Sequence, residues 1–132
     1  DHLERCLTSL RGLVDEIVVV DTGSSDETLA IAERHGARIA HLAWEDDFST
    51  PRNESLRLAT SHWALIVDAD EEVIPEAVPR LSTALTRPHF GGYFLGFRNF
   101  MSDGPQPRLL IHSAPRLVRR LEGFNRLLLE WF

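Results

Sequence analysis

The sequence predicts an α/β fold in which helices cover both faces of a doubly wound, mainly parallel sheet. Two stretches have the composition of buried strands, because residues 17–20 are a continuous β-branched run and "WALIV" (63–67) is apolar throughout. Helical patterns with short connections separate the predicted strands. An aspartate also follows each of these two strands, at Asp21 and Asp68. Ligands of such sheets bind at the carboxyl ends of the strands, so both aspartates mark the expected site.

The first half of the chain alternates between helical and extended patterns. Apolar residues at helical spacing predict a first helix within residues 1–12; they are Leu3, Cys6, Leu7 and Leu10. After the strand at 17–20, Ser24 and Glu27 have the spacing of a capping box, which predicts a helix that continues to about His35. The short "ARIAHL" (37–42) is the next predicted strand.

A third helix is expected from Thr50 as N-cap, with Pro51 at the first helical position, where its missing N–H costs nothing. The strand at 63–67 follows. Beyond Pro75 the pattern changes: 76–87 is a plausible helix, 91–100 alternates like a strand, 101–108 is a turn, and 109–120 suggests further short strands in an antiparallel arrangement.

Charge is distributed unevenly along the chain. The 132 residues carry a formal charge of -6, of which residues 45–76 contribute -7 and the remainder +1. This balance disfavours nucleic acid as a partner, because nucleic-acid binders present basic surfaces. All fourteen basic residues are arginine, and Cys6 is the single cysteine, so packing is its expected role.

The acidic run after "WALIV" has two interpretations. Taken alone, an Asp-x-Asp pattern after a strand is more often a solvated turn. In this setting, Asp68 and Asp70 could share one crevice, and a divalent cation, Mg²⁺ or Mn²⁺, would relieve their repulsion while also binding substrate phosphate oxygens. Glu71 and Glu72 are expected at a solvated helix start instead.

Two further residues are candidates for a nucleotide site. Asp21 could accept hydrogen bonds from a base or ribose, although a turn with a capped helix explains "DTGSSDET" equally well. Arg52 could bind a diphosphate bidentately, although a surface position or a structural ion pair is the default for any arginine.

Together these stretches resemble the family 2 glycosyltransferases of the GT-A fold. The matching segments are "LERCLTSLRGLVDEIVVVDTGSSDET", "WEDDFSTPRNESLRLAT" and "WALIVDADEEV", in the family's order, and "PRLVRR" is similar to a later family segment. The resemblance implies a GT-A-like sheet that lacks its first strand here, with a partly antiparallel C-terminal portion. It also implies one truncated domain over 1–132, with a nucleotide-sugar-binding half at 1–76 and the start of an acceptor-side region at 77–132.

The resemblance further implies transfer of a sugar from a nucleotide diphosphate sugar, UDP-sugar in the typical case, to a glycan, lipid or peptide acceptor with inversion. Asp21 would contact the base, Arg52 would lie near the nucleotide, Asp68 near the ribose and metal, and Asp70 would bind the Mn²⁺ or Mg²⁺ ion. No catalytic base is assigned, and neither Glu122 nor Glu130 matches the family's base segment.

Three alternatives remain open from the sequence. A haloacid dehalogenase-like phosphatase would need a later lysine, which the chain lacks. A nucleotidyltransferase would share the type of sheet and the use of a metal ion, but the sequence does not show the glycine-rich and basic phosphate loop of that class. A catalytically incomplete sugar-nucleotide-binding or interaction module would keep the same candidate residues without turnover. No apolar run approaches the roughly 20 residues of a membrane span, so we expect a cytoplasmic location, with membrane association of a longer protein left open.

Overall fold

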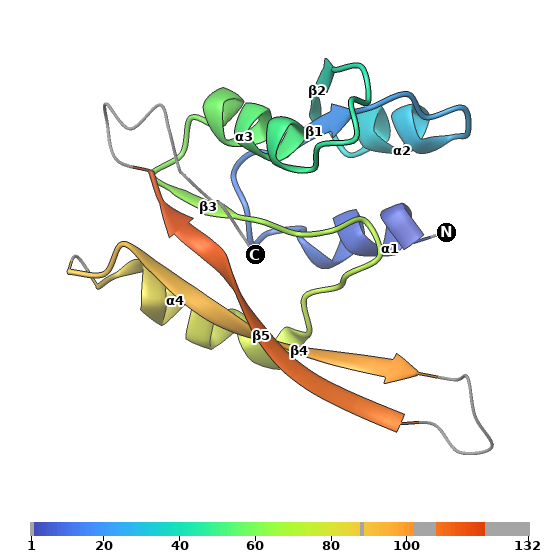
Figure 1. Ribbon diagram of the computed structural model, residues 1–132. Coiled ribbons are helices and arrows are strands. Elements are labelled where there is room, and N and C mark those ends of the chain that lie inside the picture. Colours follow the sequence, from blue (N-terminus) through green and yellow to red (C-terminus); the bar gives the residue numbers. More distant parts are fainter. Residues whose placement is uncertain (1, 88, 102–107, 121–132) are drawn as a thin grey trace.

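The computed structural model, which describes residues 2–87, 89–101 and 108–120, is a mixed α/β structure with two separate sheets (Figure 1). The first sheet is a parallel pair, β1 (Val18–Asp21) and β2 (Arg38–His41). The second is antiparallel, in the order β3–β5–β4; its strands are β3 (Trp63–Leu65), β4 (Gly92–Met101) and β5 (Arg108–Arg119). The predicted α/β class and the antiparallel C-terminal portion are therefore confirmed.

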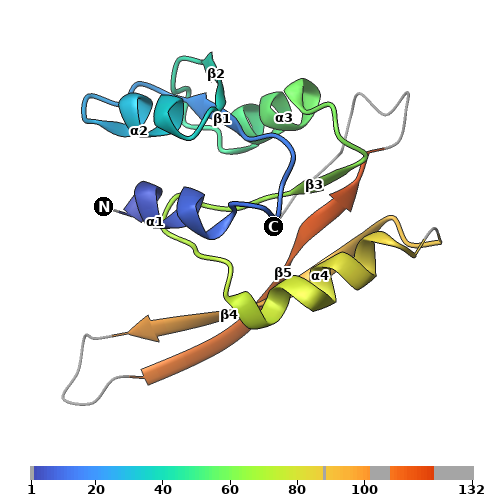
Figure 2. The same cartoon turned by 180° about the vertical axis from the view of Figure 1, so that it is seen from behind.

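Four α-helices and one short 3-10 helix accompany these strands in the described part of the chain. They are α1 (His2–Ser9), α2 (Thr28–Arg34), α3 (Ser49–Leu58), η1 (Pro75–Ala77) and α4 (Val78–Leu85). Within those residues, no helix combines the length and the apolar character that a membrane crossing requires. In both Figure 1 and Figure 2, β1 and β2 lie above α1 and the β4–β5 hairpin lies below it, with α4 alongside the hairpin.

Two helices begin at residues other than the predicted ones. The Ser24 N–H donates to the Asp21 carboxylate, so Ser24 does not cap α2, and the Asp26 carboxylate accepts from the Thr28 N–H (3.0 Å) instead. Asp47, and not Thr50, accepts the Ser49 N–H (2.9 Å) at the start of α3. The Ser49 and Thr50 hydroxyls also donate to Asp47, and these bonds lower its pKa to about 2. An aspartate two residues upstream satisfies a free N–H group in each case.

The core forms where α1 packs against α2 and against the chain that follows β3. Leu7, Leu10 and Ile31 are its buried centre, with Leu65, Val67 and Val73 packed around them. Polar contacts also connect α1 with α2. Glu4 on α1 accepts hydrogen bonds from Arg34 (3.0 Å), the last residue of α2, and from His35 (2.8 Å), which follows it. Cys6 is buried, and burial raises the pKa of its thiol to about 11, which agrees with the expected packing role.

The described residues do not form the single, mainly parallel sheet that was predicted. In the structure β3 pairs antiparallel with β5, with Trp63 opposite Arg119 and Leu65 opposite Leu117. The predicted short strands at 109–120 are one continuous strand, β5, which can therefore pair with both β3 and β4. Among the described residues, the strand pairings are therefore mostly antiparallel, and only β1 and β2 pair in parallel.

A cavity of about 850 Å³ lies between the two sheets. Val18 to Val20 of β1 line one side and residues 63–67 line the other, while α1 and α3 contribute further lining residues. The backbone carbonyls of Ile17 and Asp21 accept from β2-side N–H groups, so by strand alternation Val18 and Val20 present their backbone to the cavity edge. Among the described residues, β1 has β2 as its neighbour and β3 has β5, so both strands face the cavity with an open edge.

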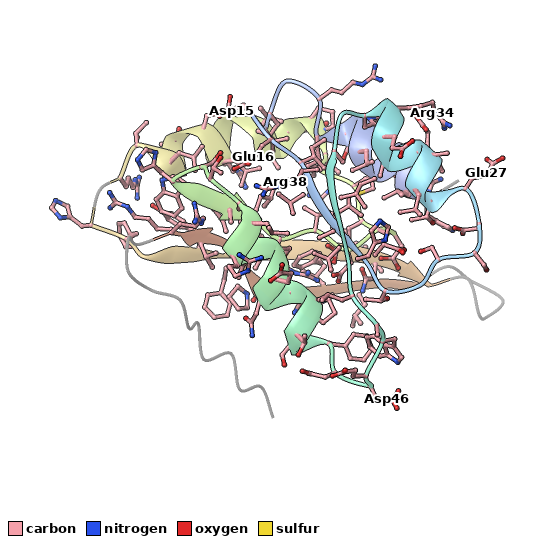
Figure 3. All side chains as sticks on the ribbon, turned by 90° about the horizontal axis from the view of Figure 1, so that it is seen from above. Asp15, Glu16, Glu27, Arg34, Arg38 and Asp46 are labelled. Atoms are coloured by element: carbon pink, nitrogen blue, oxygen red, sulfur yellow. The ribbon has the colours of Figure 1, made fainter. Side chains whose placement is uncertain are left out.

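Glu16 connects the segment before β1 with the segment between α3 and β3. Its carboxylate accepts from the Thr60 and Ser61 N–H groups (both 2.6 Å) and from the Thr60 hydroxyl (3.0 Å). Burial raises the pKa of Glu16, but these hydrogen bonds outweigh burial and lower it to about 2. Nearby, Arg38 donates to the Leu58 carbonyl (3.0 Å), so both charged groups sit at the C-terminal end of α3, with Asp46 at the other end (Figure 3).

We expect Gly92→Ala to weaken the hairpin. A Cβ at Gly92 would lie 2.9 Å from the backbone oxygen of Leu117, so the strands must move apart. The free energy of unfolding should fall by about 1–3 kcal/mol, as in overpacked sites. Gly96→Ala on the same strand is the control, because nothing lies within 4 Å of that Cβ. Urea unfolding measures both, and equal losses in the two variants would contradict the contact.

We expect Glu16→Gln to lower stability in a pH-dependent way. A carboxylate whose pKa is depressed in the folded state stabilises above its unfolded pKa of 4.5 and loses that effect as pH falls toward 2. The variant should be less stable by about 1 kcal/mol near neutral pH, since the side chain is only partly buried. Urea unfolding from about pH 7 down to about pH 2.5 should show that deficit shrinking. A deficit that stays constant with pH would contradict the role of the charge.

Candidate functional site

The residues after β3 form an acidic loop held by two arginines. One carboxylate oxygen of Asp68, Oδ1, lies 3.4 Å from Nη2 of Arg52 on α3, and the other, Oδ2, lies 2.7 Å from Nη2 of Arg116 on β5. The hydrogen bond from Arg116 is the main cause of a lowered Asp68 pKa, with burial opposing it. Asp68 is therefore a charged acceptor at a point where α3, β3 and β5 meet.

Glu71 completes this acidic loop and does not start a solvated helix, so that expectation is corrected. Its Oε2 accepts from the Asp68 N–H (2.9 Å), its N–H donates to the Asp68 carbonyl (3.0 Å), and its Oε1 lies 2.8 Å from Arg116. Burial is the main cause of a raised Glu71 pKa. Glu72 lies outside this arrangement and pairs with Arg5 at 3.0 Å. The 3-10 helix begins only at Pro75, because residues 68–71 are used to close the turn.

Asp70 is the exposed carboxylate of the acidic loop, and it makes no hydrogen bond or ion pair with the described residues. Within those residues, no group of three or more Asp, Glu, His or Cys side chains is placed to hold a metal ion. The described residues therefore do not supply a complete cation cage here. One free carboxylate does fit the manner in which Mg²⁺ and Mn²⁺ bind through one or two protein oxygens and complete their shell with phosphates and water.

Asp21 ends β1 and is buried, with 7% of its surface exposed. Its carboxylate accepts from the Ser24 N–H (3.0 Å) and the Gly23 N–H (3.3 Å), and His41 Nδ1 lies 3.4 Å away. Hydrogen bonding by Ser24 is the main cause of its lowered pKa. Gly23 has φ +114°, a conformation that glycine adopts readily, so the turn can fold back on Asp21. A carboxylate has about four acceptor positions, so most of Asp21 is already engaged by its own turn.

Arg52 and Asp68 are brought together, whereas the other predicted site residues are not in contact with them. Both line the cavity between the sheets, together with Thr22, which directly follows Asp21. The ends of β1 and β3 thus open onto the same space, as the position of their aspartates predicts. Trp44 and Phe48, which are exposed and in edge-to-face contact (4.8 Å between centroids), line that space as well.

Arg116 is the site residue that the sequence did not identify. Residues 115–120 were noted only as a similar family segment, and no role was attached to any of them. The available signal was Pro115, because a proline inside a strand usually marks a bulge or an edge. Glu122 and Glu130, which were not assigned as a base, lie outside the described residues.

Comparison with known proteins gives a family match over nearly the whole chain. A family model described as Glycosyl transferase family 2 matches residues 1–130. Among similar proteins, a TPR repeat-containing protein of Synechococcus elongatus is 50% identical over 86 residues, which are 65% of this chain and 21% of that protein. An uncharacterized glycosyltransferase of Rickettsia felis is 36% identical over 75 residues, covering 57% of this chain and 26% of that protein.

The SPbeta prophage-derived glycosyltransferase SunS of Bacillus subtilis is 36% identical over 71 residues, which cover 52% of this chain and 17% of SunS. The matched segments therefore represent about a quarter or less of each of these relatives. The activities of these relatives as whole proteins are therefore not assigned to this chain.

We expect the two aspartates of the acidic loop to differ in their effect on stability. Asp68→Ala would leave Arg116, whose side chain is mostly buried, without one of its two acceptors and should lower the free energy of unfolding by about 1–3 kcal/mol. Asp70→Ala removes an unpaired charge beside other acids and should change stability by less than about 0.5 kcal/mol or raise it slightly. Thermal and urea unfolding of both variants would test this, and a larger loss for Asp70→Ala would contradict the geometry.

Proposed function

The chain belongs to glycosyl transferase family 2, and on that premise we propose that it carries the donor site of a sugar-transfer enzyme. The donor is a nucleotide diphosphate sugar, UDP-sugar in the first instance, bound together with Mn²⁺ or Mg²⁺. The sugar passes to a glycan, lipid or peptide acceptor with inversion at the anomeric carbon. A whole protein longer than these residues would be the active enzyme.

The observation that carries this proposal is the contact of Arg52 with Asp68 at the cavity, two residues before Asp70, which is exposed and has no ion pair among the described residues. Arg52 lies in the first turn of α3. Asp68, which is ion-paired, and Asp70, which is exposed, lie two residues apart in the acidic loop after β3. A diphosphate needs positive charge from the protein and from a cation, while the cation needs a carboxylate. These residue types supply both requirements in one place.

Each residue has a distinct part in the proposal. Arg52 would bind diphosphate oxygens, for which its planar guanidinium is suited. Asp70 would hold the cation, with Asp68 close to it and to the ribose, and Asp21 would contact the base. A bound divalent cation supplies positive charge that stabilises the departing diphosphate. Arg52 adds a second positive charge on the same oxygens and fixes their direction.

The cavity between β1 and β3 supports the GT-A arrangement as the fold of the complete domain. Two open strand edges face it, and apolar side chains from α1 and α3 cover it on either side. A further parallel strand placed there would join both sheets into one and would bring its own carboxyl end to the same site. This strand would satisfy the backbone groups that Val18, Val20 and Leu65 present to the cavity.

Titration calorimetry with UDP, with and without Mn²⁺, tests the proposed function in the chain and in a longer form of it. We expect metal-dependent UDP binding, and Asp70→Ala should weaken it by about tenfold or more, since even indirect partners of metal ligands have effects of that size. Glu76→Ala is the matched control, because it removes an exposed acid of the next element.

Absence of UDP binding under every metal condition would overturn the proposal. Equal affinities in Asp70→Ala and Glu76→Ala would instead show that the acidic loop is a solvated turn. Binding of UDP without transfer or hydrolysis would favour a sugar-nucleotide-binding module over a complete enzyme.

A further inference from the structure

A β-bulge in the hairpin determines where Arg116 points. Tyr93 on β4 pairs with Leu117, but the next residue, Phe94, pairs with Pro115, so Arg116 has no partner on β4. Pro115 also lacks an N–H group for the ladder. An extra residue of this kind bends the strand and redirects a side chain, which is why bulges are frequent beside functional sites.

On its other edge, Arg116 is fixed relative to the acidic loop. Its carbonyl accepts from the Ile66 N–H at 2.7 Å, and Ile66 is two residues before Asp68. The strand register therefore brings the guanidinium to the residues that follow β3. There Nη2 contacts both Asp68 Oδ2 (2.7 Å) and Glu71 Oε1 (2.8 Å), and the group lies 5.0 Å from the Phe97 ring centroid.

The position of the guanidinium leaves part of its hydrogen-bonding capacity unused. The Arg116 side chain is 12% exposed, and its Nη1 is buried without a hydrogen-bond partner in the described part of the chain. A buried donor left unpaired costs free energy, although the ring face of Phe97 recovers part of it. What the position does provide is one positive charge, shared by two carboxylates, at the base of the acidic loop.

The charge count of the site depends on this residue. Asp68, Asp70 and Glu71 are opposed by Arg52 and Arg116, while Glu72 is paired separately with Arg5. The group carries a net charge of minus one with Arg116 and minus two without it. A bare divalent cation binds more tightly to the more negative group, whereas a diphosphate is repelled by it.

We propose that Arg116 is a positioning residue of the donor site, which holds Asp68 and Glu71 from the hairpin and makes the loop prefer a cation with diphosphate over the cation alone. This inference rests on the proposed function, because it takes the acidic loop to be the place where the diphosphate binds. Arg116 acts through the two carboxylates and does not itself touch the ligand.

The test compares Arg116→Gln and Arg116→Lys with Arg98→Gln, which removes an exposed charge from the same hairpin. Two affinities are measured for each folded variant: Mn²⁺ alone, by water-proton relaxation, and UDP with saturating Mn²⁺, by calorimetry. For Arg116→Gln we expect Mn²⁺ alone to bind about threefold to tenfold more tightly and UDP to bind about tenfold more weakly, the sizes of a nearby screened charge. Arg98→Gln should change neither.

Arg116→Lys separates charge from placement. It keeps the positive charge, so Mn²⁺ alone should bind as in the wild type, while UDP affinity should still fall because an ammonium cannot serve both carboxylates in the same geometry. This variant also decides the matter if Arg116→Gln does not fold. A parallel loss of both affinities in the variants, or no change in either, would overturn the inference and leave Arg116 as a purely structural ion pair.

The two proposals fail in different ways. If the wild type binds no UDP, the proposed function fails, and the Mn²⁺ measurement alone decides the charge effect of Arg116. A gain in Mn²⁺ affinity in Arg116→Gln but not in Arg98→Gln would support that effect, and no gain would overturn it.

Discussion

The ion pairs of Arg116 with Asp68 and Glu71 connect the hairpin to the acidic loop, and the candidate site depends on them. Asp68 and Glu71 hold each other through the loop backbone, and Arg116 holds both from β5. Without this cation, three neighbouring acids would face one arginine, Arg52, at the end of β3. Repulsion among them would then favour a more open loop. Asp68 keeps its charge and position because its counter-charge is built into a neighbouring strand.

The same constraint explains why the site lies between two structural units. The β1–β2 unit contributes Asp21 and its turn, and the antiparallel sheet contributes Arg116 and, through β3, the acidic loop. α3 bridges the two units, since Asp47 fixes its start, Arg38 and Glu16 bind at or just beyond its end, and Arg52 reaches Asp68. Under the proposed function, the base, diphosphate and sugar of a nucleotide diphosphate sugar would bind at separate points of this junction.

Local signals in the sequence predicted most of the elements but not the way in which the strands pair. Apolar spacing located α1, and the strand-final aspartates marked the chain ends that meet at one cavity, which Asp68 and Thr22, the residue after Asp21, line. The helix starts were misjudged by a few residues, because Asp26 and Asp47 accept the N–H groups of Thr28 and Ser49, and the Thr50 hydroxyl itself donates to Asp47. Pairing of β3 with β5 joins residues more than fifty positions apart, and apolar content does not encode that choice. Arg116 was missed for the same reason, since its direction depends on a bulge in the pairing of β5 with β4.

The proposed function requires that the acidic loop after β3 bind a cation and a diphosphate together. Crystals grown with UDP and Mn²⁺, and measured at the manganese absorption edge, locate the cation without reference to any assumed ligand. We expect an anomalous peak beside the Asp70 carboxylate, with the diphosphate between that peak and Arg52. A peak at another acidic group, such as the 45–47 segment before α3, with UDP bound away from Arg52, would contradict it.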